Sequence, residues 1–207
     1  MKNLRKYGKP PYSVAIVHGG PGAPGEMAPV AREISATYGV LEPLQTRDTL
    51  EGQVGELQAM LKEHGSLPLA LIGYSWGAML SFIVAAQSPS LVRKLILVGS
   101  AVFEEKYAAG IMETRLSRLS PEERATVHRL TGELDDPAGK EKDLIFARLG
   151  TLMARADSYD PILDIKNEII EYQYRIYQGV WRDAREMRSS GAFLAMGQRV
   201  KCPVLVS

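Results

Sequence analysis

The chain has little of several residue types that often point directly to a function. Its 207 residues include one cysteine and three histidines. The single cysteine, Cys202, excludes an internal disulfide, and no paired cysteines or His-x-x-x-His pattern indicates a metal site. Lysine and arginine (25) nearly balance aspartate and glutamate (24), which leaves a net charge of +1. This balance lacks the basic excess typical of proteins that bind nucleic acid or anionic membranes.

Long hydrophobic runs are also missing. No apolar stretch approaches the length of a membrane-spanning helix, and the basic residues 1–10 lack the apolar centre of a signal peptide. Hydrophobic residues make up 45% of the chain and charged residues 24%, which is typical of a globular domain. We therefore expect one cytoplasmic domain with no membrane partner.

The most informative feature of the sequence is the segment Gly73-Tyr74-Ser75-Trp76-Gly77. An apolar run over 67–72 precedes these residues and an apolar helical run over 78–86 follows them. Gly-x-Ser-x-Gly between a strand and a helix is the nucleophile elbow, in which a tight turn exposes the serine hydroxyl. The motif predicts Ser75 as a nucleophile. The alternative is a glycine-flanked turn with an idle serine.

The rest of the first half alternates between strand and helix patterns. We expect strands over 12–17, 38–44, 67–72 and 94–98, and helices over 26–37, 49–64 and 78–86. Strands that alternate with helices of this length indicate an α/β protein with a parallel sheet covered on both faces.

The second half has a different character. We interpret residues 1–102 as an α/β core, residues 103–193 as a helical insertion that forms a cap, and residues 194–207 as the return to the core. The insertion contains frequent charges and no strand pattern. Val204-Leu-Val-Ser207 has strand character again, so the last visible strand is expected there.

A glycine-rich loop, His18-Gly19-Gly20-Pro21-Gly22, directly follows the first predicted strand. Glycines let the backbone approach a substrate, and the N–H groups of such a loop can stabilise an oxyanion. The N–H of Trp76, the residue after the nucleophile, would be the second donor. A glycine-rich turn without a ligand is the alternative interpretation.

A competing motif overlaps the same loop. Residues 20–25 fit Gly-x-Gly-x-x-Gly between a strand and a helix, and Glu42 lies about twenty residues further on, as in a dinucleotide-binding fingerprint. Against this, Pro21 and Pro24 remove N–H donors from a loop that would have to hold a pyrophosphate. The dinucleotide hypothesis also leaves the elbow unexplained.

With both motifs in place, the chain resembles the α/β-hydrolase superfamily, and most closely its proline iminopeptidase-like branch, which pairs His-Gly-Gly-Pro-Gly with Gly-x-Ser-Trp-Gly. The resemblance implies a mostly parallel sheet with flanking helices and a helical cap. It also implies Ser75 as nucleophile, Gly20 and Trp76 at the oxyanion hole, and no cofactor. The positions of the supporting loop are His18, Gly19 and Gly22.

The chain departs from this family in lacking the catalytic acid and histidine, which would follow the strand at 204–207. We expect the core to be C-terminally truncated by roughly 40–60 residues, at typical element lengths. The family's opening antiparallel strands are expected to be shortened or absent before Tyr12. Of the three histidines, His18 is expected to be structural, His64 to end a helix, and His128 to lie on the surface of the cap.

The implied function is a serine hydrolase that cleaves a small ester or amide through an acyl-enzyme on Ser75, with an N-terminal prolyl or amino-acyl bond in a short peptide as one candidate. The alternative is a catalytically inactive relative that binds a ligand or partner. Candidate pocket residues are Glu104, Glu105 and Trp181. We also expect self-association through the uncovered edge of the sheet.

Overall fold

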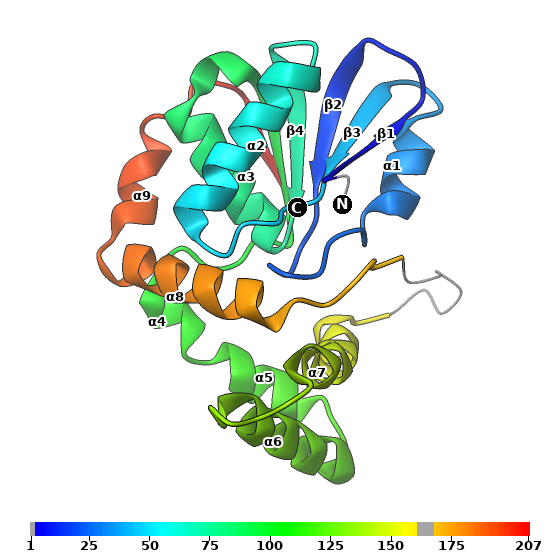
Figure 1. The fold of residues 1–207 in the computed structure, drawn as a ribbon. Coiled ribbons are helices and arrows are strands. Elements are labelled where there is room, and N and C mark those ends of the chain that lie inside the picture. The colour runs from blue at the N-terminus through cyan, green and yellow to red at the C-terminus, as the bar shows by residue number, and fades with distance from the viewer. Residues whose placement is uncertain (1–2, 161–167) are drawn as a thin grey trace.

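The computed structural model describes residues 3–160 and 168–207, which contain a single six-stranded sheet (Figure 1). The strand order is β1-β3-β2-β4-β5-β6. β1 is antiparallel to β3, and all other neighbouring strands are parallel. The strands are β1 (Leu4–Tyr7), β2 (Tyr12–Val17), β3 (Gly39–Pro43), β4 (Leu69–Tyr74), β5 (Val92–Val98) and β6 (Val204–Val206).

Helices flank this sheet and form a separate lower layer in Figure 1. The helices around the sheet are α1 (Ala28–Ile34), α2 (Leu50–His64), α3 (Trp76–Gln87), the short η1 (Pro89–Leu91) and α9 (Ala192–Gly197). The remaining helices are α4 (Glu105–Ala108), α5 (Ile111–Ser117), α6 (Pro121–Asp135), α7 (Lys142–Asp157) and α8 (Tyr174–Ser189). The predicted α/β class with a mostly parallel sheet is confirmed.

The sequence predicted that the opening antiparallel strands before Tyr12 are shortened or absent. The structure has one short antiparallel strand there, β1. Its sequence, Leu-Arg-Lys-Tyr, has no apolar run to mark it. The strand forms because it pairs with β3, with Leu4 opposite Pro43 and Tyr7 opposite Val40. Its origin is therefore tertiary pairing and not local preference.

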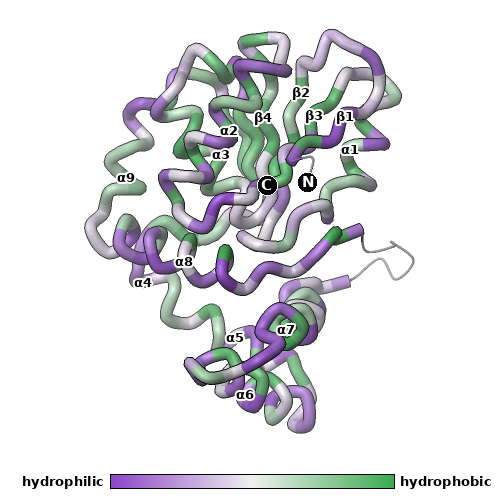
Figure 2. The backbone as a smooth tube through the Cα atoms, in the orientation of Figure 1, coloured by the Kyte–Doolittle hydropathy of each residue, from purple (hydrophilic) through white to green (hydrophobic). Residues whose placement is uncertain are grey.

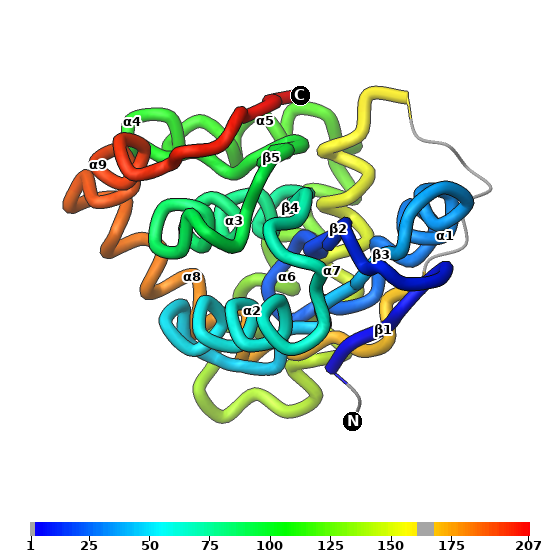
Figure 3. The backbone as a smooth tube through the Cα atoms, turned by 90° about the horizontal axis from the view of Figure 1, so that it is seen from above, coloured from blue at the N-terminus to red at the C-terminus, as the bar shows by residue number. Residues whose placement is uncertain are grey.

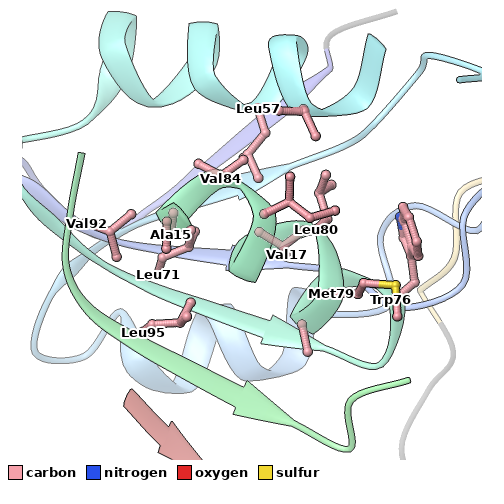
Figure 4. Packing of buried hydrophobic residues seen from close by; sticks show 14 of the residues in the cluster. Ala15, Val17, Leu57, Leu71, Trp76, Met79, Leu80, Val84, Val92 and Leu95 are labelled. Carbon is pink, nitrogen blue, oxygen red and sulfur yellow. The ribbon is translucent and has the colours of Figure 1, made fainter. Parts of the chain in front are cut away.

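The sheet separates two layers of core. Along β2, Ala15 and Val17 point into the main cluster under α2 and α3, while Val14 and Ile16 point to the opposite face under α1. Alternate residues of a strand lie on opposite faces, so a fully apolar strand needs a cover on each side. Figure 4 shows the main cluster, in which Trp76 lies beside Met79 at the start of α3.

The lower helices pack mainly on one another. Leu119, Val127 and Ala156 form a small cluster between α5, α6 and α7, separate from the main core. Figure 2 shows hydrophobic residues dominating β4 and mixed residues along α6, α7 and α8. None of the helices in the described ranges is long and apolar enough to cross a membrane.

Helix α8 connects these two regions. Val180 and Ala184 are fully buried in the main cluster, and Asp183 accepts a hydrogen bond from the backbone N–H of Leu50 at the start of α2 (3.0 Å). Seen from above, α8 runs beneath the sheet layer next to α2 (Figure 3). Helix α8 thus links the core to residues 168–173, which precede the helix.

Candidate active site

The elbow lies where β4 ends and α3 begins. Ser75 has φ 51° and ψ −114°, a left-handed conformation that non-glycine residues rarely adopt. Its side chain is half-buried, and its N–H is held by Val98 O at 2.9 Å. A Cβ at Gly77 would lie 2.3 Å from Val17 O, and one at Gly73 would lie 2.2 Å from Gly77 O. The two motif glycines are therefore required by close backbone contacts on either side of Ser75.

The strain at Ser75 yields a stability prediction. Ser75→Gly should raise the free energy of unfolding by about 1 kcal/mol. Glycine adopts a positive φ without strain, whereas a non-glycine residue in this conformation destabilises the folded state by about that amount. Ser75→Ala keeps the Cβ and serves as the matched control, with no comparable gain. Urea titration of both variants measures the difference. Equal stabilities would contradict the assignment of strain to this residue.

The glycine-rich loop faces the elbow. The backbone N–H of Gly19 donates to Glu26 Oε1 at 2.6 Å and so is not free for an oxyanion. Gly20 has φ +27°, and its N–H, like that of Trp76, has no acceptor among the residues that the structure describes. The structure thus leaves free the two N–H groups that the sequence predicted as oxyanion donors.

Glu26 is a residue that the sequence analysis did not identify. A Cβ at Gly19 would lie 2.5 Å from Glu26 Oε1 and 3.2 Å from the Cβ of Ser75, so the carboxylate and the serine flank the same glycine. Burial raises the pKa of Glu26, and the hydrogen bond from Gly19 partly offsets this. The sequence offered only an acid at the start of a predicted helix, which carries no signal for this contact.

The histidine of the loop is part of the fold and not a base for Ser75. His18 is fully buried, with Nδ1 2.7 Å from Gly19 O and Nε2 accepting from the N–H of Gln45 at 3.4 Å. Burial lowers the pKa of His18 to about 4. Both ring nitrogens are therefore occupied by backbone groups, and the ring is neutral.

The other two histidines lie away from the elbow contacts. His64 ends α2 beside Lys6, with Nδ1 3.3 Å from Nζ, and His128 is exposed on α6. The hydroxyl of Ser75 has no hydrogen-bond partner among the described residues, and these include all three histidines. Among the described residues, the structure therefore places the glycine-rich loop beside Ser75, with no histidine hydrogen-bonded to this serine.

The structure does not support the dinucleotide hypothesis. The carboxylate of Glu42 is fully buried and accepts a hydrogen bond from Tyr7 Oη at 2.7 Å. The loop is also covered, because Gly22 O accepts from Gln173 N at 2.7 Å and Pro24 O accepts from Ile170 N at 2.9 Å. A ribose hydroxyl cannot reach the buried Glu42, and residues 170–173 cover the Gly22–Pro24 part of the loop that would hold a pyrophosphate.

The three predicted pocket residues have different surroundings. Trp181 packs edge-on against Trp76, with ring centroids 5.3 Å apart. Glu104 pairs with Lys106 at 3.1 Å, and Glu105 pairs with Arg188 at 2.7 Å. Only Trp181 is placed in contact with a residue of the elbow. Among the described residues, no group of three metal-ligating side chains is found.

Comparison with known proteins agrees with this geometry. Residues 45–134, which include the elbow, match a family described as the alpha/beta hydrolase fold. No curated protein sequence matches the chain. Among solved structures, the chain is similar to a thioesterase domain from the curacin biosynthetic pathway (19% identity, TM-score 0.56), covering 98% of this chain and 77% of that one.

Two further structures show the same likeness. One is E-2-(acetamidomethylene)succinate hydrolase, with 18% identity, a TM-score of 0.57, and coverage of 98% of this chain and 74% of that chain. The other is a hydrolase from Pseudomonas aeruginosa, with 15% identity, a TM-score of 0.57 and the same coverage. The chain therefore has the α/β-hydrolase fold.

Proposed function

We propose that the chain is a serine hydrolase that cleaves a small ester or amide through an acyl-enzyme on Ser75. The observation that carries the proposal is the elbow. Ser75 has a strained positive φ, its hydroxyl has no partner among the described residues, and it lies beside Gly19 of the glycine-rich loop. The N–H groups of Gly20 and Trp76 likewise have no acceptor among those residues. Attack by the hydroxyl on a carbonyl would place the developing oxyanion within reach of preorganised donors. The hydrolases of the same fold support this class of reaction.

Attack also requires a proton acceptor. Ser75 is far too weak a nucleophile at neutral pH without one. None of the three histidines has a hydrogen bond to it, so we propose that the base and its orienting acid come from residues outside 1–207. Within these residues the chain supplies the nucleophile, the oxyanion donors and the roof. The roof is the proposed cap over 103–193, with Trp181 as the pocket residue nearest to the elbow by contact.

A finer proposal concerns the substrate. The pairing of the two motifs favours an N-terminal prolyl or amino-acyl group in a short peptide over a long-chain acyl group. Glu104 and Glu105 remain the proposed acids for an amino group. Because each already pairs with a cation, such a substrate would have to displace Lys106 or Arg188.

Trapping of the acyl-enzyme tests the proposal. The chain is incubated with a p-nitrophenyl acyl ester at mildly alkaline pH, and peptide mass spectrometry locates the adduct. We expect an acyl group on Ser75 that is absent from Ser75→Ala. An adduct distributed equally over other serines would contradict the proposal.

A second candidate is a catalytically inactive binding protein of the same fold. The observation in its favour is that, among the described residues, no histidine is hydrogen-bonded to Ser75. It predicts no adduct at Ser75 under any condition, together with stabilisation of the folded chain by a small-molecule ligand in a thermal-shift screen.

We further propose that the chain self-associates through β6. Val204, Leu205 and Val206 are 46%, 58% and 69% exposed, on a strand that pairs with β5 alone in the described part of the chain. An exposed apolar edge strand promotes pairing between sheets. Light scattering should show oligomers that Leu205→Lys reduces to monomers, while Lys201→Glu, on the exposed loop before the strand, leaves them unchanged. A monomeric wild-type chain at high concentration would contradict this prediction.

A further inference from the structure

The segment before α8 lies directly on the glycine-rich loop. Ile170 N donates to Pro24 O at 2.9 Å and Gln173 N donates to Gly22 O at 2.7 Å. The approach is close: a Cβ at Gly22 would lie 2.3 Å from Gln173 O. Gly22 also has φ +83°, so only glycine suits this position on both counts. The loop that presents Gly20 is therefore held between the core and residues 168–173.

Helix α8 continues from this segment onto the other side of the site. Trp181 packs edge-on against Trp76 at 5.3 Å, and Trp76 is itself held from α2, since its Nε1 donates to Gln53 at 2.9 Å. Helix α8 and residues 168–173 thus contact both parts of the chain that carry a proposed oxyanion donor. These parts are the glycine-rich loop, which carries Gly20, and Trp76.

The position of α8 is tightly specified at its centre. A Cβ at Gly179 would lie 2.1 Å from Asp48 O, just before α2. The neighbouring Val180 is fully buried, and Asp183 holds the N–H of Leu50 at 3.0 Å. A side chain at residue 179 would force the helix away from α2, and with it both Trp181 and Gln173.

We propose that α8 and residues 168–173 position the oxyanion hole, with Gln173 acting through the glycine-rich loop and Trp181 acting through Trp76. The inference rests on the proposed function in that the hole serves Ser75. Gln173 and Trp181 are positioning residues, because neither presents a free donor to the substrate. When α8 leaves its place, the two donors lose their common support.

Two variants test the proposal in the whole chain. Gly179→Val displaces α8, and Trp181→Ala removes the ring that packs against Trp76 and Tyr177, with Trp181→Phe as the conservative rescue. Gly132→Val in α6 is the control, because a Cβ at Gly132 has no neighbour within 4 Å. The chain has only two tryptophans, so near-ultraviolet circular dichroism and indole fluorescence report directly on the Trp76–Trp181 pair.

The first measurement is amide hydrogen exchange, which needs no activity. In Gly179→Val the N–H groups of Ile170, Gln173 and Ala23 should lose protection, while those of β4 keep theirs and Gly132→Val matches the wild type. Ala23 is informative because its N–H donates to Gly20 O within the loop itself. Undisturbed protection of Ala23 after the tryptophan signal has changed would overturn the proposal.

The second measurement is the rate of phosphonylation of Ser75 with imidazole added as base. The maximal rate should fall by up to about 100-fold in Trp181→Ala, the scale for loss of an oxyanion donor, with little change in probe binding and with recovery in Trp181→Phe. An unchanged maximal rate would overturn the proposal. If Gly179→Val does not fold, Trp181→Ala decides by both measurements. If the wild type is not labelled at all, the proposed function fails, and hydrogen exchange alone decides on the positioning.

Discussion

Gly77→Ala should prevent the chain from folding stably. A Cβ at this position would lie 2.3 Å from Val17 O and 2.4 Å from His18 O, both backbone atoms of β2 and the residue after it. Neither oxygen can move without separating α3 from the sheet. We therefore expect the free energy of unfolding to fall by more than about 4 kcal/mol, as it does when a protein core is disrupted. Urea titration followed by circular dichroism measures the loss.

The matched control is Gly55→Ala. Gly55 is also a helical glycine, but it is exposed on α2 and a Cβ there has no neighbour within 4 Å. The replacement should stabilise the chain by up to about 1 kcal/mol through helix propensity. If Gly77→Ala were as stable as Gly55→Ala, the close packing of the elbow against β2 would be wrong.

The second large effect is the acid sensitivity conferred by His18. Burial lowers its pKa from 6.5 to about 4. As the pH falls below 6.5, the unfolded chain binds a proton at this residue and the folded chain does not, so the free energy of unfolding falls until about pH 4. At 1.36 kcal/mol per pKa unit, the loss over this window is about 3 kcal/mol.

Proton NMR of the imidazole checks the cause directly. The His18 ring should titrate near pH 4, far below the 6.5 of an exposed histidine. His18→Gln should remove this part of the acid dependence of stability, whereas His128→Gln, an exposed replacement on α6, should retain it. A His18 midpoint near 6.5 would show that the ring is not enclosed between Gly19 O and the N–H of Gln45.

The parts of the fold that the sequence predicted are those with a local signature. Continuous apolar runs marked β2 and β4 because both faces of these strands are covered. The elbow was predictable because Gly73, Ser75 and Gly77 form a five-residue motif, although the contact that requires Gly77 is with the backbone of β2. Strand β1 was missed because its Leu-Arg-Lys-Tyr sequence becomes a strand only through pairing with β3.

The parts of the site that the sequence could not predict depend on contacts between distant segments. Glu26 reaches Gly19 because the glycine-rich loop turns back on itself. Gly179 meets Asp48 O across more than a hundred residues, and no pattern in either segment marks the contact. The proposed roles of Ser75 and Gly20 rest on sequence motifs, whereas the contacts that support these residues are visible only in the tertiary structure.

The central proposal is that Ser75 is a nucleophile served by an oxyanion hole, with no base hydrogen-bonded to it among the residues that the structure describes. Labelling with a fluorophosphonate probe, with and without added imidazole, tests it most directly, with Ser75→Ala as the control. We expect slow labelling of Ser75 by the chain alone, marked acceleration by imidazole, and no labelling of this site in Ser75→Ala. Rapid labelling without imidazole would contradict the claim by requiring a base within the chain. Absence of labelling in both conditions would contradict it by showing that the serine is idle.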